Sequence, residues 1–371
     1  MILRTDCIHF PGDRPCRFNK ETGQVCTDCP YYISPSGRIL IIKLDAVGDV
    51  LRSTSILPAL HRKYPGYEIT WITRQNAVEL FRHNPLVHHV AAFEKTETQL
   101  KVLNEEYDIL IHPDSNPGSG SMASLVKAKE KYGFITDTQG NVKPMNEAAQ
   151  NWLEMGAFDQ LKKANQQSYQ KILHDLCGLK YQKDEIQLFL SSEEKAFRES
   201  FIKLNYLSRF RKIIGLNTGA SARWKLKQWH QHHLESLIAA FQDDSETGIL
   251  LYGGPEEKER NKILKEKFPF VIDTGTENTL RQFFALLDIS DIILTGDTLG
   301  LHAATALKKQ VICLFGPTSS AEIEDYGRVT KIIPDMECLV CYKPVCDFKP
   351  NCMDLISPSL VQSVIREKLH N

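Results

Sequence analysis

Short runs of apolar residues alternate with amphipathic stretches along most of the chain. The first run, 38–44, is continuous and rich in β-branched residues, which is typical of a strand buried on both faces. The next segment, 50–62, has the apolar spacing expected of a helix. Further strand candidates, separated by helical patterns, lie at 69–73, 89–93 and 108–111. This alternation predicts a parallel, doubly wound sheet.

The same rhythm restarts in the second half of the chain, with predicted strands at 212–217, 248–252, 291–295 and 311–315. A polar turn and two helical stretches, near 136–179, precede a charged helical segment at 192–207. We interpret the segment 136–179 as an insertion or a helical lid, and we place a domain boundary near the segment 192–207. The predicted organisation is a Cys-rich segment (1–36), two Rossmann-like domains (37–205 and 206–335) and a second Cys-rich segment with a terminal helix (336–371).

The length and composition fit two globular domains. The chain has 371 residues, of which 42% are hydrophobic and 25% charged. No apolar run approaches the roughly eighteen residues that span a bilayer. The first residues carry a cysteine and charges where a signal peptide has its apolar core. We therefore expect a cytoplasmic protein without a transmembrane segment.

The charge balance favours no particular macromolecular partner. A formal net charge of −1 provides no field that would draw the protein to nucleic acid or to an anionic membrane. We expect no nucleic-acid partner, and no basic amphipathic helix indicates work on a lipid surface. The sequence leaves open whether the protein forms a homo-oligomer.

The most informative motif is Thr-Gly-Asp-Thr-Leu-Gly-Leu-His at 295–302, where a predicted strand ends and a helix begins. Free backbone N–H groups and the helix dipole at such a point favour a diphosphate. Asp297, Thr298 and His302 are candidates to contact it. Taken alone, the motif is equally compatible with an N-cap and a packed histidine.

Three other loops after predicted strands carry groups that a nucleotide diphosphate needs. One contains Thr218 and Gly219, with Lys227 further on as a cation for the leaving phosphate. Glu257 follows the next strand and could accept from ribose hydroxyls, although helix capping explains it equally well. The loop 315–319 adds further hydroxyl groups.

Together, these four loops resemble the heptosyltransferases of glycosyltransferase family 9 in order, spacing and residue type. The resemblance implies a GT-B fold, in which two Rossmann-like domains face each other across a cleft. The family pattern has glycine directly after the Asp-Thr pair, whereas here Leu299 intervenes. The resemblance further implies a nucleotide heptose donor, typically ADP-heptose, surrounded by Gly219, Ala220, Lys227, Glu257, Asn278, Asp297, Thr298, Gly300 and His302.

The first domain offers a candidate general base. Gly48 and Asp49 lie at the turn from the first strand into the first helix, and the family has a similar Gly-Asp element, which implies that Asp49 is the base. Attack of a hydroxyl on an anomeric carbon needs a carboxylate to take the proton, and a single displacement inverts the anomeric configuration. Helix capping by Asp49 is the structural alternative. Asp45 is a less favoured base, and Lys43 could hold an acceptor anion.

The residues do not specify an acceptor. A lipopolysaccharide core sugar, another glycan, a protein and a small molecule all stay open.

Eight cysteines form two groups of four at the ends of the chain, and each group contains a Cys-x-x-Cys pair. Four thiolates can close a tetrahedral site for zinc or iron, in a structural role that the transfer chemistry does not require. Protein-modifying relatives hold iron with a four-cysteine finger, and free thiols or adventitious disulfides are the alternative. The groups are Cys7, Cys16, Cys26 and Cys29, and Cys338, Cys341, Cys346 and Cys352.

Other functions fit the same architecture less well. A GT-B transferase or epimerase with another nucleotide sugar stays open, as does a non-catalytic, metal-bound nucleotide-binding scaffold. An NAD-dependent oxidoreductase is disfavoured because no G-x-G-x-x-G follows the first strand of either domain.

Overall fold

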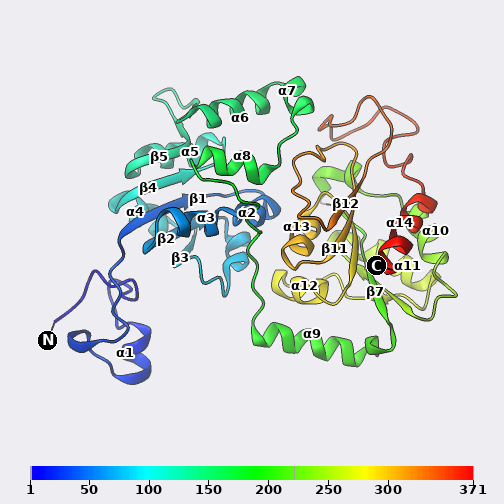
Figure 1. Ribbon diagram of the computed structural model, residues 1–371, viewed down its shortest axis with the longest axis horizontal. Helices are drawn as coiled ribbons and strands as arrows, with labels where there is room; N and C mark the ends of the chain where they lie inside the picture. Colours follow the sequence, from blue (N-terminus) through cyan, green and yellow to red (C-terminus); the bar gives the residue numbers. More distant parts are fainter. Residues whose placement is uncertain (1, 221, 371) are drawn as a thin grey trace.

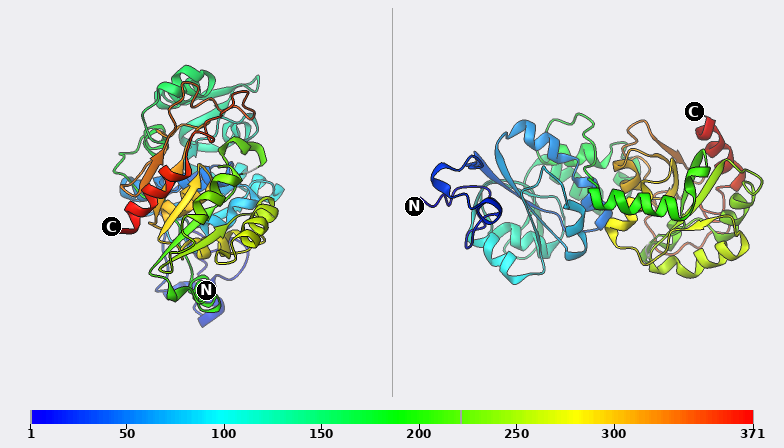
Figure 2. Two further views of the ribbon diagram at one scale, coloured as in Figure 1. Left: turned by 90° about the vertical axis from the view of Figure 1, so that its right-hand side faces the viewer. Right: turned by 90° about the horizontal axis from the view of Figure 1, so that it is seen from below.

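The structure is a computed structural model that describes residues 2–220 and 222–370. Two α/β domains, each built on a six-stranded sheet, lie side by side along the long axis of the molecule (Figure 1). A small segment at the N-terminus stands at the outer end of the first domain (Figure 2). It holds the helix α1 (Arg17–Thr22) and the 3₁₀ helix η1 (Cys26–Asp28).

The first sheet has the strand order β3-β2-β1-β4-β5-β6. Neighbouring strands pair in parallel except β5 and β6, which pair antiparallel. The strands are β1 (Gly37–Ile42), β2 (Tyr67–Thr73), β3 (His89–Ala92), β4 (Glu106–His112), β5 (Lys127–Thr136) and β6 (Val142–Pro144). Between them run α2 (Val47–Ser53), α3 (Ile56–Lys63), the 3₁₀ helix η2 (Gln75–Phe81), α4 (Thr96–Asn104) and α5 (Pro117–Leu125).

Three helices follow β6, where the sequence predicted two: α6 (Glu147–Ala157), α7 (Asp159–Ala164) and α8 (Tyr169–Leu176). They lie together on one side of the first sheet, with α7 nearest the second domain (Figure 1). The charged helix α9 (Ser192–Leu204) then runs parallel to the long axis of the molecule and packs on α12 (Leu280–Leu287) of the second domain (Figure 2). A buried bidentate pair holds α9 there, because Arg281 donates to both carboxylate oxygens of Glu194 at 2.7 and 2.6 Å.

The second sheet has the order β12-β11-β10-β7-β8-β9, and all its neighbouring strands pair in parallel. Its strands are β7 (Lys212–Asn217), β8 (Thr247–Tyr252), β9 (Ile272–Asp273), β10 (Ile292–Gly296), β11 (Gln310–Leu314) and β12 (Val329–Ile332). Its helices are η3 (Leu207–Arg209), η4 (Ala222–Lys227), α10 (Gln231–Ala239), η5 (Pro255–Glu257), α11 (Lys258–Lys267), α12 (Leu280–Leu287), α13 (Leu299–Ala306) and α14 (Pro358–His370).

Both sheets reverse their strand order at one point, β1 beside β4 in the first and β7 beside β10 in the second. In open parallel sheets, ligands bind outside the carboxyl ends of the strands at such points. The largest cluster of buried apolar side chains is continuous from the first sheet to α13. Packing between α2 and α13 therefore brings the two reversal points face to face.

The apolar runs predicted eight strands, β1–β4 in the first sheet and β7, β8, β10 and β11 in the second, but β5, β6, β9 and β12 were not predicted, and one predicted helix is divided. The helix predicted at 50–62 is broken between α2 and α3, because Pro58 has no N–H to donate to the carbonyl of Thr54. The strand β5 was missed because its first five residues are Lys-Ala-Lys-Glu-Lys, a pattern that no apolar period marks as a strand.

The close packing of the second sheet generates a stability prediction. A Cβ added at Gly215, in the central strand β7, would lie 2.5 Å from the Tyr252 ring and 2.6 Å from the Ser290 hydroxyl. We expect Gly215→Ala to destabilise the fold by roughly 1–3 kcal/mol through overpacking. Gly156→Ala in α6 is the matched control, because its Cβ enters open space and gains roughly 0.5–1 kcal/mol. Thermal unfolding of both variants checks this, and equal melting temperatures would contradict it.

Candidate active site

A cleft of about 740 Å³ lies between the two domains at the facing reversal points. The first domain contributes the start of α2, and the second contributes the loops after β7, β8, β10 and β11 together with α12. The predicted site residues that line it are Gly48, Asp49, Gly219, Ala220, Lys227, Glu257, Asn278, Asp297, Thr298, Gly300 and His302.

Two predicted residues do not line the cleft. The Thr218 hydroxyl points into the second domain, where it donates to Asn261 Oδ1 at 2.6 Å. The Lys43 ammonium is buried and forms an ion pair with the Asp114 carboxylate. Although burial opposes the charge of Lys43, Asp114 raises its pKa above the ordinary value. Both residues hold the loops behind the cleft, and neither presents its side chain to a ligand there.

Asp49 lies in the first turn of α2, where one of its oxygens accepts from the backbone N–H of Ala46 at 3.3 Å. The other oxygen is 2.8 Å from Arg52 Nη2. The side chain keeps 38% of its surface exposed to the cleft. Desolvation raises the pKa of Asp49, but Arg52 and Lys43 outweigh it and lower the pKa to about 2. Asp49 therefore both caps the helix and presents an ionised carboxylate to the cleft.

Arg52 is a functional candidate that the sequence did not reveal. Its guanidinium carbon lies 3.7 Å from the centre of the Tyr169 ring, and its Nη2 lies 3.9 Å from Glu322 Oε2 in the second domain. Its Nε is buried and has no hydrogen-bond partner among the residues that the structure describes. Burial raises the pKa of Glu322, although Arg52 opposes this rise. Arg52 thus joins carboxylates of both domains.

Gly48 allows α2 to approach α13 closely. A Cβ at this position would lie 3.1 Å from His302 Cδ2 and 3.5 Å from the Leu299 Cα. His302 is only 6% exposed. Burial, reinforced by Arg52, lowers the pKa of His302 to about 4. At neutral pH the cleft therefore contains an uncharged imidazole beside the Asp49 carboxylate.

Asp297 and Lys227 form an ion pair at the end of β10. Lys227 Nζ donates to the Asp297 carboxylate at 2.8 Å and to its carbonyl at 3.0 Å. Burial raises the pKa of Asp297, but Lys227 and His302 lower it below the ordinary value. An ammonium group has three N–H donors, and beyond these two hydrogen bonds the Lys227 ammonium lies 5.2 Å from the centre of the Trp224 ring, at the lining of the cleft.

The start of α13 explains the displaced glycine of the motif. Thr298 caps this helix by accepting from the N–H of Gly300 at 3.1 Å. A Cβ at Gly300 would lie 2.8 Å from Asn217 Nδ2, so the close approach of Asn217 requires glycine there. Leu299 lines the cleft itself.

On the opposite wall, Glu257 lies against the loop after β7. A Cβ at Gly219 would lie 2.0 Å from Glu257 Oε1, so the carboxylate occupies the space that any side chain at 219 would need. Glu257 also accepts from the Gly254 N–H at 2.8 Å, and burial raises its pKa. Asn278 lies further along the same wall, and its amide donates to the carbonyls of Thr274 and Gly275.

The second Cys-rich segment reaches the cleft through Tyr342, which the sequence did not reveal either. The Tyr342 hydroxyl donates to Glu322 at 3.0 Å and accepts from the Ser319 N–H at 3.3 Å. Its backbone N–H donates to the Pro317 carbonyl at 2.8 Å. Lys162 of α7 lies 4.6 Å from the centre of its ring. Through Tyr342 this segment is part of the cleft wall, which the sequence analysis did not predict.

None of the ten cysteines, all of which lie in the described part of the chain, forms a disulfide. The four at the N-terminus line one hollow of about 590 Å³, whereas in the second group Cys352 is buried against Gly316. Within residues 2–220 and 222–370, no three His, Cys, Asp or Glu side chains come together closely enough to hold a metal ion.

Two α/β domains that face each other across one cleft, with glycine, hydroxyl and ammonium groups on the loops of the second domain, are typical of a nucleotide-binding enzyme. The sequence profile of glycosyltransferase family 9 (heptosyltransferase) matches residues 97–351. The chain therefore belongs to this family and is a glycosyltransferase.

Individual proteins are similar to this chain in sequence or in fold. The lipopolysaccharide heptosyltransferase 1 of Escherichia coli K12 is 21% identical over 321 residues, which cover 78% of this chain and 91% of that protein. A glycosyltransferase family 9 structure from Veillonella parvula superposes with a TM-score of 0.70 at 16% identity, covering 90% and 97% of the two chains. The iron-containing dodecameric glycosyltransferase TibC of enterotoxigenic E. coli superposes with a TM-score of 0.54 at 10% identity, covering 91% and 77%.

In the described part of the chain, no helix is long and apolar enough to cross a membrane.

The lowered pKa of His302 predicts a pH-dependent stability. In the unfolded chain this histidine titrates near pH 6.5, but in the fold near 4. Between these values only the unfolded state takes up the proton, so stability falls as pH drops from 6.5 to 4. His302→Gln should flatten this part of the profile, as measured by urea unfolding across pH. A profile as steep as that of the wild type would contradict a buried neutral His302.

Proposed function

We propose that this protein is an inverting GT-B heptosyltransferase that moves a heptose from ADP-heptose to a hydroxyl group of a glycan or protein acceptor. The observation that carries the proposal is that Asp49 lines the same cleft as the motif of Asp297, Thr298 and His302. In the proposal, Asp49 is the general base and the motif at the helix start binds the diphosphate. Support for the donor comes from the family and from TibC, which was crystallised with ADP-D-β-D-heptose.

The donor occupies the second-domain side of the cleft. Its diphosphate lies at the start of α13, where backbone N–H groups and the helix dipole favour negative charge. Lys227 and the neutral His302 donate to the phosphate oxygens, and Gly219 lets the backbone approach them. Glu257 accepts hydrogen bonds from the ribose hydroxyls, and the adenine ring of the donor lies near Asn278 and Phe283.

Asp49 takes the proton of the acceptor hydroxyl as its oxygen attacks the anomeric carbon. The bond between that carbon and the diphosphate oxygen breaks at the same time, so ADP leaves from the opposite face and the configuration inverts. Because the transition state resembles an oxocarbenium ion, the hydroxyl becomes acidic as its bond to carbon forms, and an ionised carboxylate of low basicity can accept the proton. Arg52 orients Asp49 and keeps it ionised.

A matched pair of variants tests the base. We expect Asp49→Asn to lower kcat by about 10²- to 10⁴-fold, the usual value of a general base, while ADP affinity measured by calorimetry changes little. Asp45→Asn is the control, because that carboxylate pairs with Arg74 outside the cleft and should keep nearly full activity. Full activity of Asp49→Asn would refute the assigned base, and inactivity of Asp45→Asn alone would transfer the role to Asp45.

We also propose that the two cysteine groups bind zinc or iron in a structural role. The N-terminal segment supports this, because residues 2–36 contain no buried residue and small segments without a core need a metal or disulfides. Its four thiols line one hollow, although they must draw together to ligate an ion. TibC, a structural neighbour, contains iron.

Elemental analysis of the purified protein tests the metal. We expect bound zinc or iron, and the double variant Cys26→Ser/Cys29→Ser should lose the share held by the N-terminal group and lower the melting temperature. Cys177→Ser, a change in the core of the first domain, should leave the metal content unchanged. A wild-type protein purified without metal from zinc- and iron-supplemented medium would contradict the proposal.

A further inference from the structure

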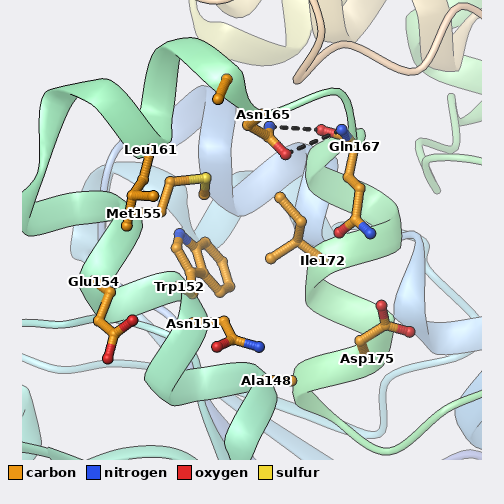
Figure 3. A pocket seen from close by; sticks show the side chains of 11 residues that line it. Ala148, Asn151, Trp152, Glu154, Met155, Leu161, Asn165, Gln167, Ile172 and Asp175 are labelled. Carbon is orange, nitrogen blue, oxygen red and sulfur yellow. Dashed lines mark hydrogen bonds between the residues drawn. The ribbon is translucent and has the colours of Figure 1, made fainter.

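A second hollow, of about 440 Å³, lies in the helical insertion of the first domain, between α6, α7 and α8. Trp152 projects into its middle and is flanked by the apolar side chains of Met155, Leu161 and Ile172 (Figure 3). Trp152 is half-buried, since one edge of its ring packs on Tyr169 at 5.4 Å between centres. The hollow thus presents an aromatic surface to a ligand.

Polar side chains surround this aromatic surface. Asn151 and Asp175 lie on one side of the hollow, and Asn165 and Gln167 lie on the other (Figure 3). The Asn165 side chain fixes its own turn, because its amide donates to the Gln167 carbonyl at 2.9 Å and its oxygen accepts from the Gln167 N–H at 3.0 Å. Amide and carboxylate groups therefore flank the indole ring with both donors and acceptors.

We propose that this hollow binds a sugar unit of the acceptor, as a subsite for a glycan whose terminal hydroxyl reaches Asp49. This inference rests on the proposed function and narrows its acceptor class to a glycan. A sugar ring has an apolar face of C–H groups that packs on an aromatic ring, and hydroxyls at its edge that exchange hydrogen bonds with amides and carboxylates. An acyl chain would offer no hydrogen bond to the amides of Asn151 and Gln167, whereas sugar hydroxyls can pair with both.

The position of the hollow relative to the cleft supports this occupant. Tyr169 separates the two, with Trp152 at its edge and the Arg52 guanidinium over its ring. At the other end of the insertion, Lys162 of α7 contacts Tyr342 in the cleft wall. One layer of side chains thus divides the hollow from the carboxylate that would activate the acceptor. In the proposed complex the glycan passes over this layer, with one hydroxyl at Asp49 and a sugar further along its chain on Trp152.

A glycan array probed with the labelled full-length protein in the presence of ADP tests the subsite. The array carries bacterial surface oligosaccharides and common hexose oligomers. We expect the wild type to bind a set of glycans, and Trp152→Ala to weaken that binding by about tenfold, the loss of one aromatic contact. Trp152→Phe should retain most of the binding. Phe158→Ala is the matched control, because Phe158 is an exposed aromatic residue beside the hollow that does not line it.

Asn151→Ala is a second test of the subsite in case Trp152→Ala does not fold. Asn151 is exposed, so removal of its side chain disturbs no packing. We expect it to weaken glycan binding roughly three- to tenfold, the value of one net hydrogen bond. ADP affinity by calorimetry should equal that of the wild type in every variant.

Three results would overturn the subsite. In the first, the protein binds ADP but captures no glycan. In the second, it binds glycans, and Trp152→Ala and Asn151→Ala leave this binding unchanged. In the third, it binds no glycan but binds dodecanoate saturably, and Trp152→Ala abolishes the dodecanoate binding. Failure of ADP to bind would instead refute the proposed donor, so the two proposals fail separately.

Discussion

The site depends on the close approach of two helix starts, α2 from the first domain and α13 from the second. Gly48 makes this approach possible, because any side chain there would meet His302 and the backbone of Leu299. The approach places Asp49 and Arg52 of α2 beside the residues that follow β10. Without it, each domain would hold half of the cleft lining, and the Asp49 carboxylate would face solvent instead of the loop that contains Asp297 and Thr298.

Charges of opposite sign are matched across this approach. Arg52 and Lys227 are both largely buried, and each holds a carboxylate ionised, Asp49 in one case and Asp297 in the other. Burying an unpaired charge is costly, so these pairings are what permits four ionised groups in one narrow cleft. Glu322, further from Arg52, has its pKa raised by burial. The pairs fix the geometry before any ligand arrives, which favours binding and transition-state stabilisation.

Much of this arrangement followed from the sequence, for physical reasons. Buried parallel strands appear as short apolar runs, and loops that follow such strands must gather at one edge of a sheet, which brought together Gly219, Glu257 and Asp297. The Gly-Asp turn at 48–49 was found in the same way. Thr218 and Lys43, the two predicted residues that do not line the cleft, are of the right type, but their side chains turn away from it. Which way a side chain turns depends on packing, and the sequence pattern does not report it.

The residues that were missed are those whose role depends on contact between distant segments. Arg52 looks like one more polar residue of an amphipathic helix, and its contacts with Tyr169 and Glu322 exist only once both domains are in place. Tyr342 likewise lies beside a cysteine motif that drew the interpretation toward metal binding. The four loops predicted to bind the donor are local features, whereas the wall around Arg52 is built from three separate parts of the chain.

The central claim is that this cleft binds a nucleotide heptose. Calorimetric titration of the full chain with ADP-heptose tests it most directly, with UDP-N-acetylglucosamine as the competing donor. We expect one ADP-heptose to bind per chain, and the UDP sugar to bind weakly or not at all. Gly219→Ala should lose ADP-heptose binding, because its Cβ would lie 2.0 Å from Glu257. Gly254→Ala should bind normally, because its Cβ would lie 3.6 Å from Glu257. Preferential binding of the UDP sugar, or ADP-heptose binding that Gly219→Ala leaves intact, would contradict the claim.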